Sequence, residues 1–149
     1  MSTNMQVLIP LIVDDAALVS SSVAEDDHAE WSNVTTYALG DRVISTSAHR
    51  IYESLQNGNT NHDPLTDDGT WWIDAGPTNR WAMFDESVGT ATAATDSIVV
   101  VLEPATQVGG IVLLGSQAAQ MQVRIERTST SELVYTTTVS LDSYPVGDW

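Results

Sequence analysis

The residue types that could perform chemistry in this chain are aromatic rings, carboxylates and histidines. The 149 residues include five tryptophans and four tyrosines but no cysteine, so neither a thiolate nucleophile nor a disulfide framework is available. The sequence also lacks a Gly-x-Ser-x-Gly elbow and a glycine-rich phosphate loop. His28, His49 and His62 are far apart and lack the spacing of metal ligands, so we expect each to be a solvated loop residue. We therefore expect no enzymatic activity, no catalytic residue, no metal site and no cofactor.

Aromatic rings can bind a sugar by stacking on the C–H face of its ring while polar neighbours bind the hydroxyl groups. Trp71 and Trp72 are adjacent on a predicted strand, so their side chains must point to opposite faces and one ring can remain exposed. Together with Tyr37 or Tyr52, the exposed tryptophan would form a sugar-binding platform. The alternative is that all these rings fill the core of a small unit or an interface with a neighbouring subunit.

The carboxylates give a weaker signal. A glycosidase needs two carboxyl groups that flank one cleft, and in a chain with 20 acidic residues such pairs arise by chance. The loop that contains Asp63, Asp67 and Asp68 could offer oxygen ligands to Ca²⁺, but it lacks the spacing of a calcium-binding hand. We expect this loop to be a solvated turn.

The charge balance excludes several classes of partner. Twenty acidic residues and five arginines, with no lysine, give a net charge of −15. Nucleic acids and anionic membrane surfaces both require a basic face, so we expect neither as a partner. Apolar runs are far shorter than the ~20 residues of a membrane-spanning helix, and the N-terminus lacks the pattern of a secretory signal. The acidity favours a soluble, self-repelling surface, adaptation to salt, or a basic or cation-bridged partner.

The first 30 residues are predicted to form an arm and linker. Within it, residues 5–13 are prone to form a strand, which Pro10 would confine to a sheet edge. A single helical turn could follow at residues 16–19. The arm cannot bury both of its faces alone, so it would dock either on a neighbouring subunit or on the sheet of its own chain.

Residues 31–76 are predicted to form a small β unit with an aromatic core. Strands are expected at residues 42–46 and 50–55, joined by a hairpin turn at residues 47–49, and a third strand at residues 70–74 follows a polar loop.

The remaining residues, 77–149, are predicted to form a β-sandwich of jelly-roll type. The apolar run 97–102 predicts a strand buried on both faces, and residues 111–114 predict another. Residues 120–127 alternate, with Met121, Val123 and Ile125 facing inward, and should pair with residues 133–141 through a turn. Four such strands favour a sandwich, so the fold class is all-β.

Four residues are candidates for structural or interface roles: Trp31, Arg80, Trp81 and Phe84. A strand across residues 80–85 would place Trp81 on one face, with Arg80 and Phe84 on the other. Because Arg80 is one of only five cations, we expect it to form a buried or interface ion pair with an acidic residue.

An ordered set of residues carries a first resemblance. The set is Trp31, Tyr37-Ala38-Leu39-Gly40-Asp41-Arg42-Val43, Tyr52, Asn61-His62-Asp63-Pro64 and Trp71. In order and spacing it resembles the small chitin- and cellulose-binding modules of carbohydrate-binding families 5 and 12. Arg50 and Ile51 replace the glycine that the family has before the second-strand tyrosine, so the hairpin turn should differ.

A second resemblance covers the run Gly76-Pro77-Thr78-Asn79-Arg80-Trp81-Ala82-Met83-Phe84-Asp85, then Gly89-Thr90, and the later segments 111–115 and 134–141. These resemble virion proteins of tailed bacteriophages, in which a small sugar-module-like unit precedes a β-sandwich. The resemblance implies a structural protein of the tail tip, baseplate or fibre-attachment region, located in the phage tail. Implied partners are further copies of the chain, other tail and baseplate proteins, and host cell-surface polysaccharide.

Two other functions remain open. One is a carbohydrate-binding module attached to a secreted polysaccharide hydrolase, and the other is a capsid decoration protein. The lack of a secretory signal and the phage-like residues 79–85 favour the tail protein over the hydrolase module. The resembling proteins continue into another strand beyond Trp149, so we expect either a longer natural chain or a neighbouring subunit that covers the open sheet edge.

Overall fold

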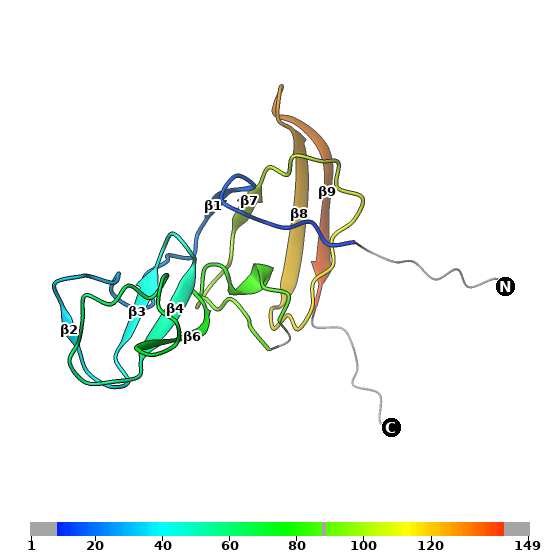
Figure 1. Cartoon of the computed structure of the whole chain (residues 1–149). Coiled ribbons are helices and arrows are strands. Elements are labelled where there is room, and N and C mark those ends of the chain that lie inside the picture. The colour runs from blue at the N-terminus through cyan, green and yellow to red at the C-terminus, as the bar shows by residue number, and fades with distance from the viewer. Residues whose placement is uncertain (1–8, 88, 142–149) are drawn as a thin grey trace, which may run out of the picture. The chain divides into compact units, whose positions relative to one another are not determined.

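A computed structural model describes residues 9–87 and 89–141 of the chain, and Figure 1 shows its elements. Apart from one 3-10 helix, its regular elements are all β-strands, which confirms the all-β class. The chain divides into two compact units, residues 1–104 and residues 105–149, and each is described by itself. The helical content of the described residues includes nothing long and apolar enough to cross a membrane.

The centre of the first unit is a three-stranded antiparallel sheet in the order β3-β4-β6 (Figure 1). These strands are β3 (Arg42–Ser45), β4 (Arg50–Ser54) and β6 (Trp72–Pro77). The hairpin predicted between the first two is confirmed, and its turn places His49 in the left-handed region with a φ of 57°. The short strands β2 (Thr36–Tyr37) and β5 (Asn59–Thr60) pair with each other beside this sheet.

The core of this sheet unit is aromatic, as predicted. Tyr37, Val43 and Trp72 are buried together, and the rings of Tyr37 and Trp72 meet edge to face with centroids 5.2 Å apart. The Trp72 indole N–H donates a hydrogen bond of 2.8 Å to the carbonyl of His62, so the polar atom of the buried ring is paired. Trp31, Tyr52 and Trp71 pack against this core from its margin.

The arm contributes a strand to its own chain. Strand β1 (Leu18–Ser21) pairs antiparallel with β7 (Val100–Leu102), with a bulge between Leu18 and Ser20. Of the two docking modes considered for the arm, this segment therefore adopts the intramolecular one. The strand predicted at residues 5–13 lies partly outside the described residues, and its described part, residues 9–13, is not a strand. The turn before β1 is held by Asp14, whose carboxylate accepts hydrogen bonds from the amides of Ala16 and Ala17.

Two strand predictions in the first unit need correction. The third strand of the sheet begins at Trp72 rather than at residue 70, because the Asp67 carboxylate binds the amides of Trp71 and Trp72 and extends the loop to that point. Residues 97–102 do not form a strand buried on both faces, since only Val100–Leu102 are in β7, and Val101 is exposed. An uncharged apolar run indicates that burial is favourable, but it does not determine which neighbouring strand would pair with it.

Residues 80–85 also differ from their prediction. They do not form a strand, because the Thr78 carbonyl accepts the amides of both Trp81 and Ala82 at 2.9 Å and starts the 3-10 helix η1 (Ala82–Phe84). As a result Trp81 and Phe84 do not lie on opposite faces. Their rings meet edge to face with centroids 5.9 Å apart.

The second unit contains the antiparallel hairpin of β8 (Gln120–Arg127) and β9 (Glu132–Ser140), which confirms the predicted pairing. Residues 111–114 were predicted to form a strand, and the structure shows none there. Packing of these strands into a sandwich stays a prediction. The expectations about Trp149 and a strand beyond it lie outside the described residues.

Candidate functional site

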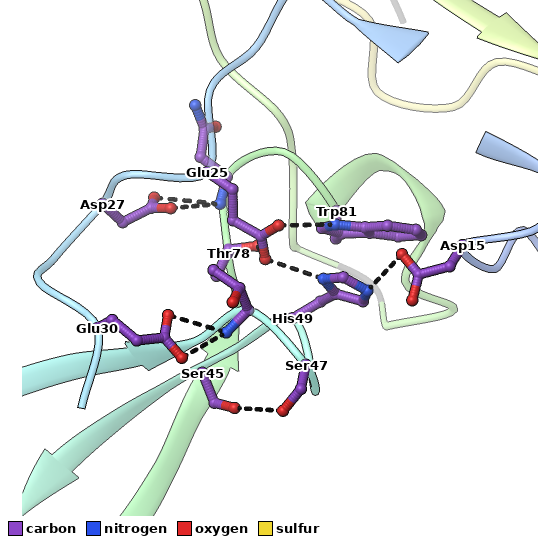
Figure 2. A network of polar contacts seen from close by, with 11 residues as sticks. Asp15, Glu25, Asp27, Glu30, Ser45, Ser47, His49, Thr78 and Trp81 are labelled. Carbon is purple, nitrogen blue, oxygen red and sulfur yellow. Dashed lines mark hydrogen bonds and ion pairs between the residues drawn. The ribbon is translucent and has the colours of Figure 1, made fainter. Parts of the chain in front are cut away.

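Segments far apart in the sequence meet around His49 in the turn of the β3–β4 hairpin (Figure 2). The Nδ1 atom lies 3.0 Å from Glu25 Oε1, and Nε2 lies 3.1 Å from Asp15 Oδ1. The imidazole also stacks on the indole of Trp81, with ring centroids 3.9 Å apart and planes inclined by 21°. The prediction that His49 is a solvated loop residue is therefore wrong, because both of its nitrogens and its ring have partners.

Glu25 is the centre of this cluster. Besides His49, its carboxylate accepts hydrogen bonds from Thr78 Oγ1 at 2.9 Å and from Trp81 Nε1 at 3.3 Å (Figure 2). The Thr78 amide in turn donates to the His49 carbonyl at 2.9 Å. The Glu25 side chain is only 11% exposed, whereas that of Asp15 is 77% exposed. The desolvated carboxylate is thus stabilised by three polar side chains.

Two more acidic residues of the arm bind backbone amides of the same sheet unit (Figure 2). The Asp27 carboxylate accepts from the Asn79 amide at 3.1 and 3.2 Å, and the Glu30 carboxylate accepts from the Thr46 amide at 3.2 Å. Residue Glu30 also forms a parallel bridge with Ile44. We name the residues that make these contacts the arm clasp: Glu25, Asp27, Glu30, Thr46, His49, Thr78, Asn79 and Trp81.

The arm clasp has the geometry of a structural joint. A histidine that acts as a general base needs a free nitrogen within hydrogen-bond reach of the proton it takes. Both nitrogens of His49 face carboxylates, and its ring stacks on Trp81. The hydroxyl groups of Ser45 and Ser47 form a hydrogen bond with each other, with their oxygens 3.0 Å apart. The arrangement therefore ties the arm to the hairpin turn and to the segment after β6.

A second ionic contact joins β4 to β6. The Arg50 guanidinium binds the Asp74 carboxylate through two nitrogens, with Nε at 2.9 Å and Nη2 at 2.8 Å, and its Nη1 lies 3.7 Å from Asp85. The hydrogen bond to Asp74 raises the pKa of Arg50. Burial, followed by the charge of Asp74, raises the pKa of the neighbouring Tyr52 phenol. These contacts fix the direction in which the chain leaves the sheet.

The candidate sugar-binding rings occupy different environments. Tyr37 and Trp72 are in the core and present no ring face to a ligand. Trp71 and Tyr52 are half-buried at its margin. Trp71 stacks on the imidazole of His62, with centroids 3.9 Å apart and planes inclined by 10°. His62 lies in a loop, as predicted, and is half-buried beside Trp71. The sugar-binding proposal rests on Trp71 and Tyr52.

The loop that was considered for Ca²⁺ uses its carboxylates on its own chain. Asp67 accepts from the amides of Gly69, Trp71 and Trp72, and Asp63 accepts from the Leu65 amide. Asp68 accepts from the Thr70 hydroxyl and amide, and these bonds lower the pKa of Asp68. Within the described ranges, no three histidine or acidic side chains are grouped as metal ligands would be.

The remaining structural candidates have distinct surroundings. The Trp31 amide donates to the Ile44 carbonyl at 3.0 Å, and its ring packs on the core. Trp81 and Phe84 pack beside His49 and each other. Arg80 forms no ion pair among the described residues, and its buried Nε has no hydrogen-bond partner there. The intramolecular form of the Arg80 prediction is therefore wrong, whereas an ion pair at an interface stays a prediction.

Comparisons with protein-family models, curated proteins and solved structures found no match to this chain. Sequence reasoning missed Glu25, whose carboxylate lies beside His49, and Thr78, whose hydroxyl donates to that carboxylate. In the sequence, Glu25 is one acidic residue among 20 in a short acidic linker, and no local pattern distinguishes it.

Proposed function

We propose that this chain is a structural component of a tailed-phage particle, at the tail tip, the baseplate or the fibre-attachment site. It assembles with other virion proteins and with further copies of itself. The small β unit of residues 31–76 presents Trp71 and Tyr52 as a weak contact surface for host cell-surface polysaccharide. The protein holds surfaces in place and catalyses no reaction.

One observation carries the assembly role. None of the described residues of the second unit, 105–141, is buried, although this stretch contains a hairpin with strands of eight and nine residues. A lone two-stranded hairpin is at best marginally stable in water, and stability requires a packed apolar face. This unit therefore needs a partner surface, as expected for an assembling protein.

The phage-like segment supports the same role. Three of its residues make arm-clasp contacts: Thr78, Asn79 and Trp81. Their side chains or amides bind the arm, so the residues that resemble the virion signature have structural functions in this fold. A free carbohydrate-binding module attached to an enzyme would need neither the clasp nor the hairpin unit.

The sugar contact is supported by the position of Trp71. Its ring is half-buried and backed by His62, so it is held rigidly at the edge of the core. A rigid aromatic surface loses little conformational entropy when it stacks on a sugar. One such contact is weak, and several copies in one particle would raise the effective affinity by avidity.

Immunogold labelling of native phage particles tests the main proposal. We expect label at the distal end of the tail. Label on the capsid would indicate a decoration protein, and a protein found only free of particles would contradict a virion role. Glycan-array binding tests the sugar contact separately: Trp71→Ala should abolish binding, whereas Leu65→Ala, an exposed apolar residue in the neighbouring loop, should retain it.

A further inference from the structure

We propose that the apolar face of the β8–β9 hairpin is the surface through which copies of this chain associate, and that its occupant is the same face of a second copy. This inference rests on the proposed assembly function and adds to it the contact surface and the partner.

The strand register defines this face. Met121, Val123 and Ile125 of β8 lie directly opposite Val139, Thr137 and Tyr135 of β9. Directly opposite residues in an antiparallel pair share one side of the sheet, and the register of these three pairs is regular up to Ile125. The other side carries Gln122, Arg124, Thr136 and Thr138. One side of the hairpin is therefore apolar and the other is polar, which is the pattern of a sheet that packs on one side.

The apolar side is open. Ile125 is 40% exposed and Tyr135 is 51% exposed. A groove of about 410 Å³ runs between this side and residues 108–111. The following residues of that segment, Val112, Leu113 and Leu114, are also exposed. A groove with apolar walls has room for side chains of a partner and offers them no charge to bind, so the partner surface must itself be apolar.

The distribution of charge indicates a second copy. Residues 1–104 contain 16 of the 20 acidic residues and three of the five arginines, a net charge of −13, whereas residues 105–149 contain four acidic residues and two arginines, a net charge of −2. Copies that met through the first unit would bring like charges together, at a cost that salt only partly screens. Contact through the second unit avoids this repulsion.

The charges near the hairpin are also neutralised within it. Arg124 pairs with Glu126 on β8, and Arg127 lies 3.5 Å from Glu132 across the turn. The apolar face is thus an uncharged patch on an acidic chain. It is self-complementary, since apolar side chains meet apolar side chains when two identical faces are brought together by a symmetry axis. Burial of this face would supply the core that the hairpin lacks.

Two neighbouring substitutions give a matched test. Val123 faces the apolar side and Gln122 the polar side, so Val123→Glu and Gln122→Glu add the same charge at adjacent positions on opposite faces. We expect the full chain and Gln122→Glu to elute as multimers of the 16.1 kDa chain in light-scattering chromatography. Val123→Glu should elute as a monomer. Tryptophan fluorescence of this variant verifies that its sheet unit remains folded.

A cross-linking experiment decides the question even if Val123→Glu unfolds the hairpin. The chain has no cysteine, so each single-cysteine variant has one reactive thiol. On oxidation, Ile125→Cys should give at least tenfold more disulfide-linked dimer than Arg124→Cys, which faces the polar side. Equal yields from the two variants would overturn the inference.

A monomeric full chain would also overturn it, because self-association through this face requires a second copy. This failure differs from failure of the proposed function. A monomer that labels phage tails refutes only the self-association, whereas a multimer that is absent from particles refutes only the virion role.

Discussion

Replacement of Glu25 by alanine should lower the free energy of unfolding of the first unit by about 3 kcal/mol. The carboxylate binds His49, Thr78 and Trp81 at distances from 2.9 to 3.3 Å. A hydrogen bond to a charged group contributes about 1.5–3 kcal/mol net, and a buried group left without its partner costs about 1–3 kcal/mol. The three bonds share one carboxylate, so their energies do not simply add, and water will enter part of the vacated site. A loss near that of one to two bonds is therefore expected.

Urea unfolding measures this loss, with intrinsic fluorescence as the probe, because Trp81 is itself part of the arm clasp. Glu25→Gln keeps the shape and one acceptor oxygen but removes the charge, so it should lose about half as much stability. Asp15→Ala is the control: Asp15 binds the other nitrogen of the same histidine, but its side chain is 77% exposed. An exposed ion pair contributes at most about 1 kcal/mol, so this variant should lose less than that.

Two results would refute the reasoning. If Glu25→Ala and Asp15→Ala lost the same stability, burial of Glu25 would have no energetic consequence. If Glu25→Ala lost less than about 1 kcal/mol, the arm would be held by strand pairing and apolar burial alone, and the clasp would only accompany that packing.

Three further predictions follow from burial and from the pKa shifts. Trp72→Ala removes a ring that is 2% exposed and should cost about 3–5 kcal/mol in urea unfolding, whereas Trp71→Ala, at the margin of the core, should cost about half as much. Burial raises the pKa of Tyr52. The contribution of this residue to stability is therefore present below the ordinary tyrosine pKa and disappears as pH rises through the folded-state value. Tyr52→Phe should remove this loss of stability at alkaline pH, and an ultraviolet titration of the variant should lack the phenol with the raised pKa. The Thr70 hydrogen bonds lower the pKa of Asp68. The contribution of Asp68 to stability is therefore present above the ordinary carboxyl pKa and disappears as pH falls through the lowered value. Thr70→Val should raise the Asp68 pKa toward its ordinary value in an NMR titration.

The sequence predicted those elements whose signal is local. Alternation at Met121, Val123 and Ile125 specified β8 and its apolar side, and the turn at residues 47–49 specified the β3–β4 hairpin. Predictions failed where an apolar run was taken as a strand, as at residues 111–114. Such a run indicates only that burial is favourable, whereas a strand also needs hydrogen-bonding neighbours from elsewhere in the chain.

In the candidate sites, too, local features were predictable and contacts between distant segments were not. Strand alternation predicted that one of Trp71 and Trp72 could be buried, and it is Trp72. The arm clasp was not predictable because its contacts are distant in sequence: Glu25 is 24 residues from His49 and 56 residues from Trp81. Pairing at such separations depends on the fold, and a chain rich in carboxylates gives no reason to choose one of them.

The intramolecular fate of the arm also limits how copies can meet. Its strand β1 is paired with β7 at one end, and the arm clasp holds it at the other, so these residues are not free to dock on a neighbour. The side of the β8–β9 hairpin that carries Ile125 and Tyr135 remains as an exposed apolar surface. Assembly through that side keeps the arm paired within its own subunit.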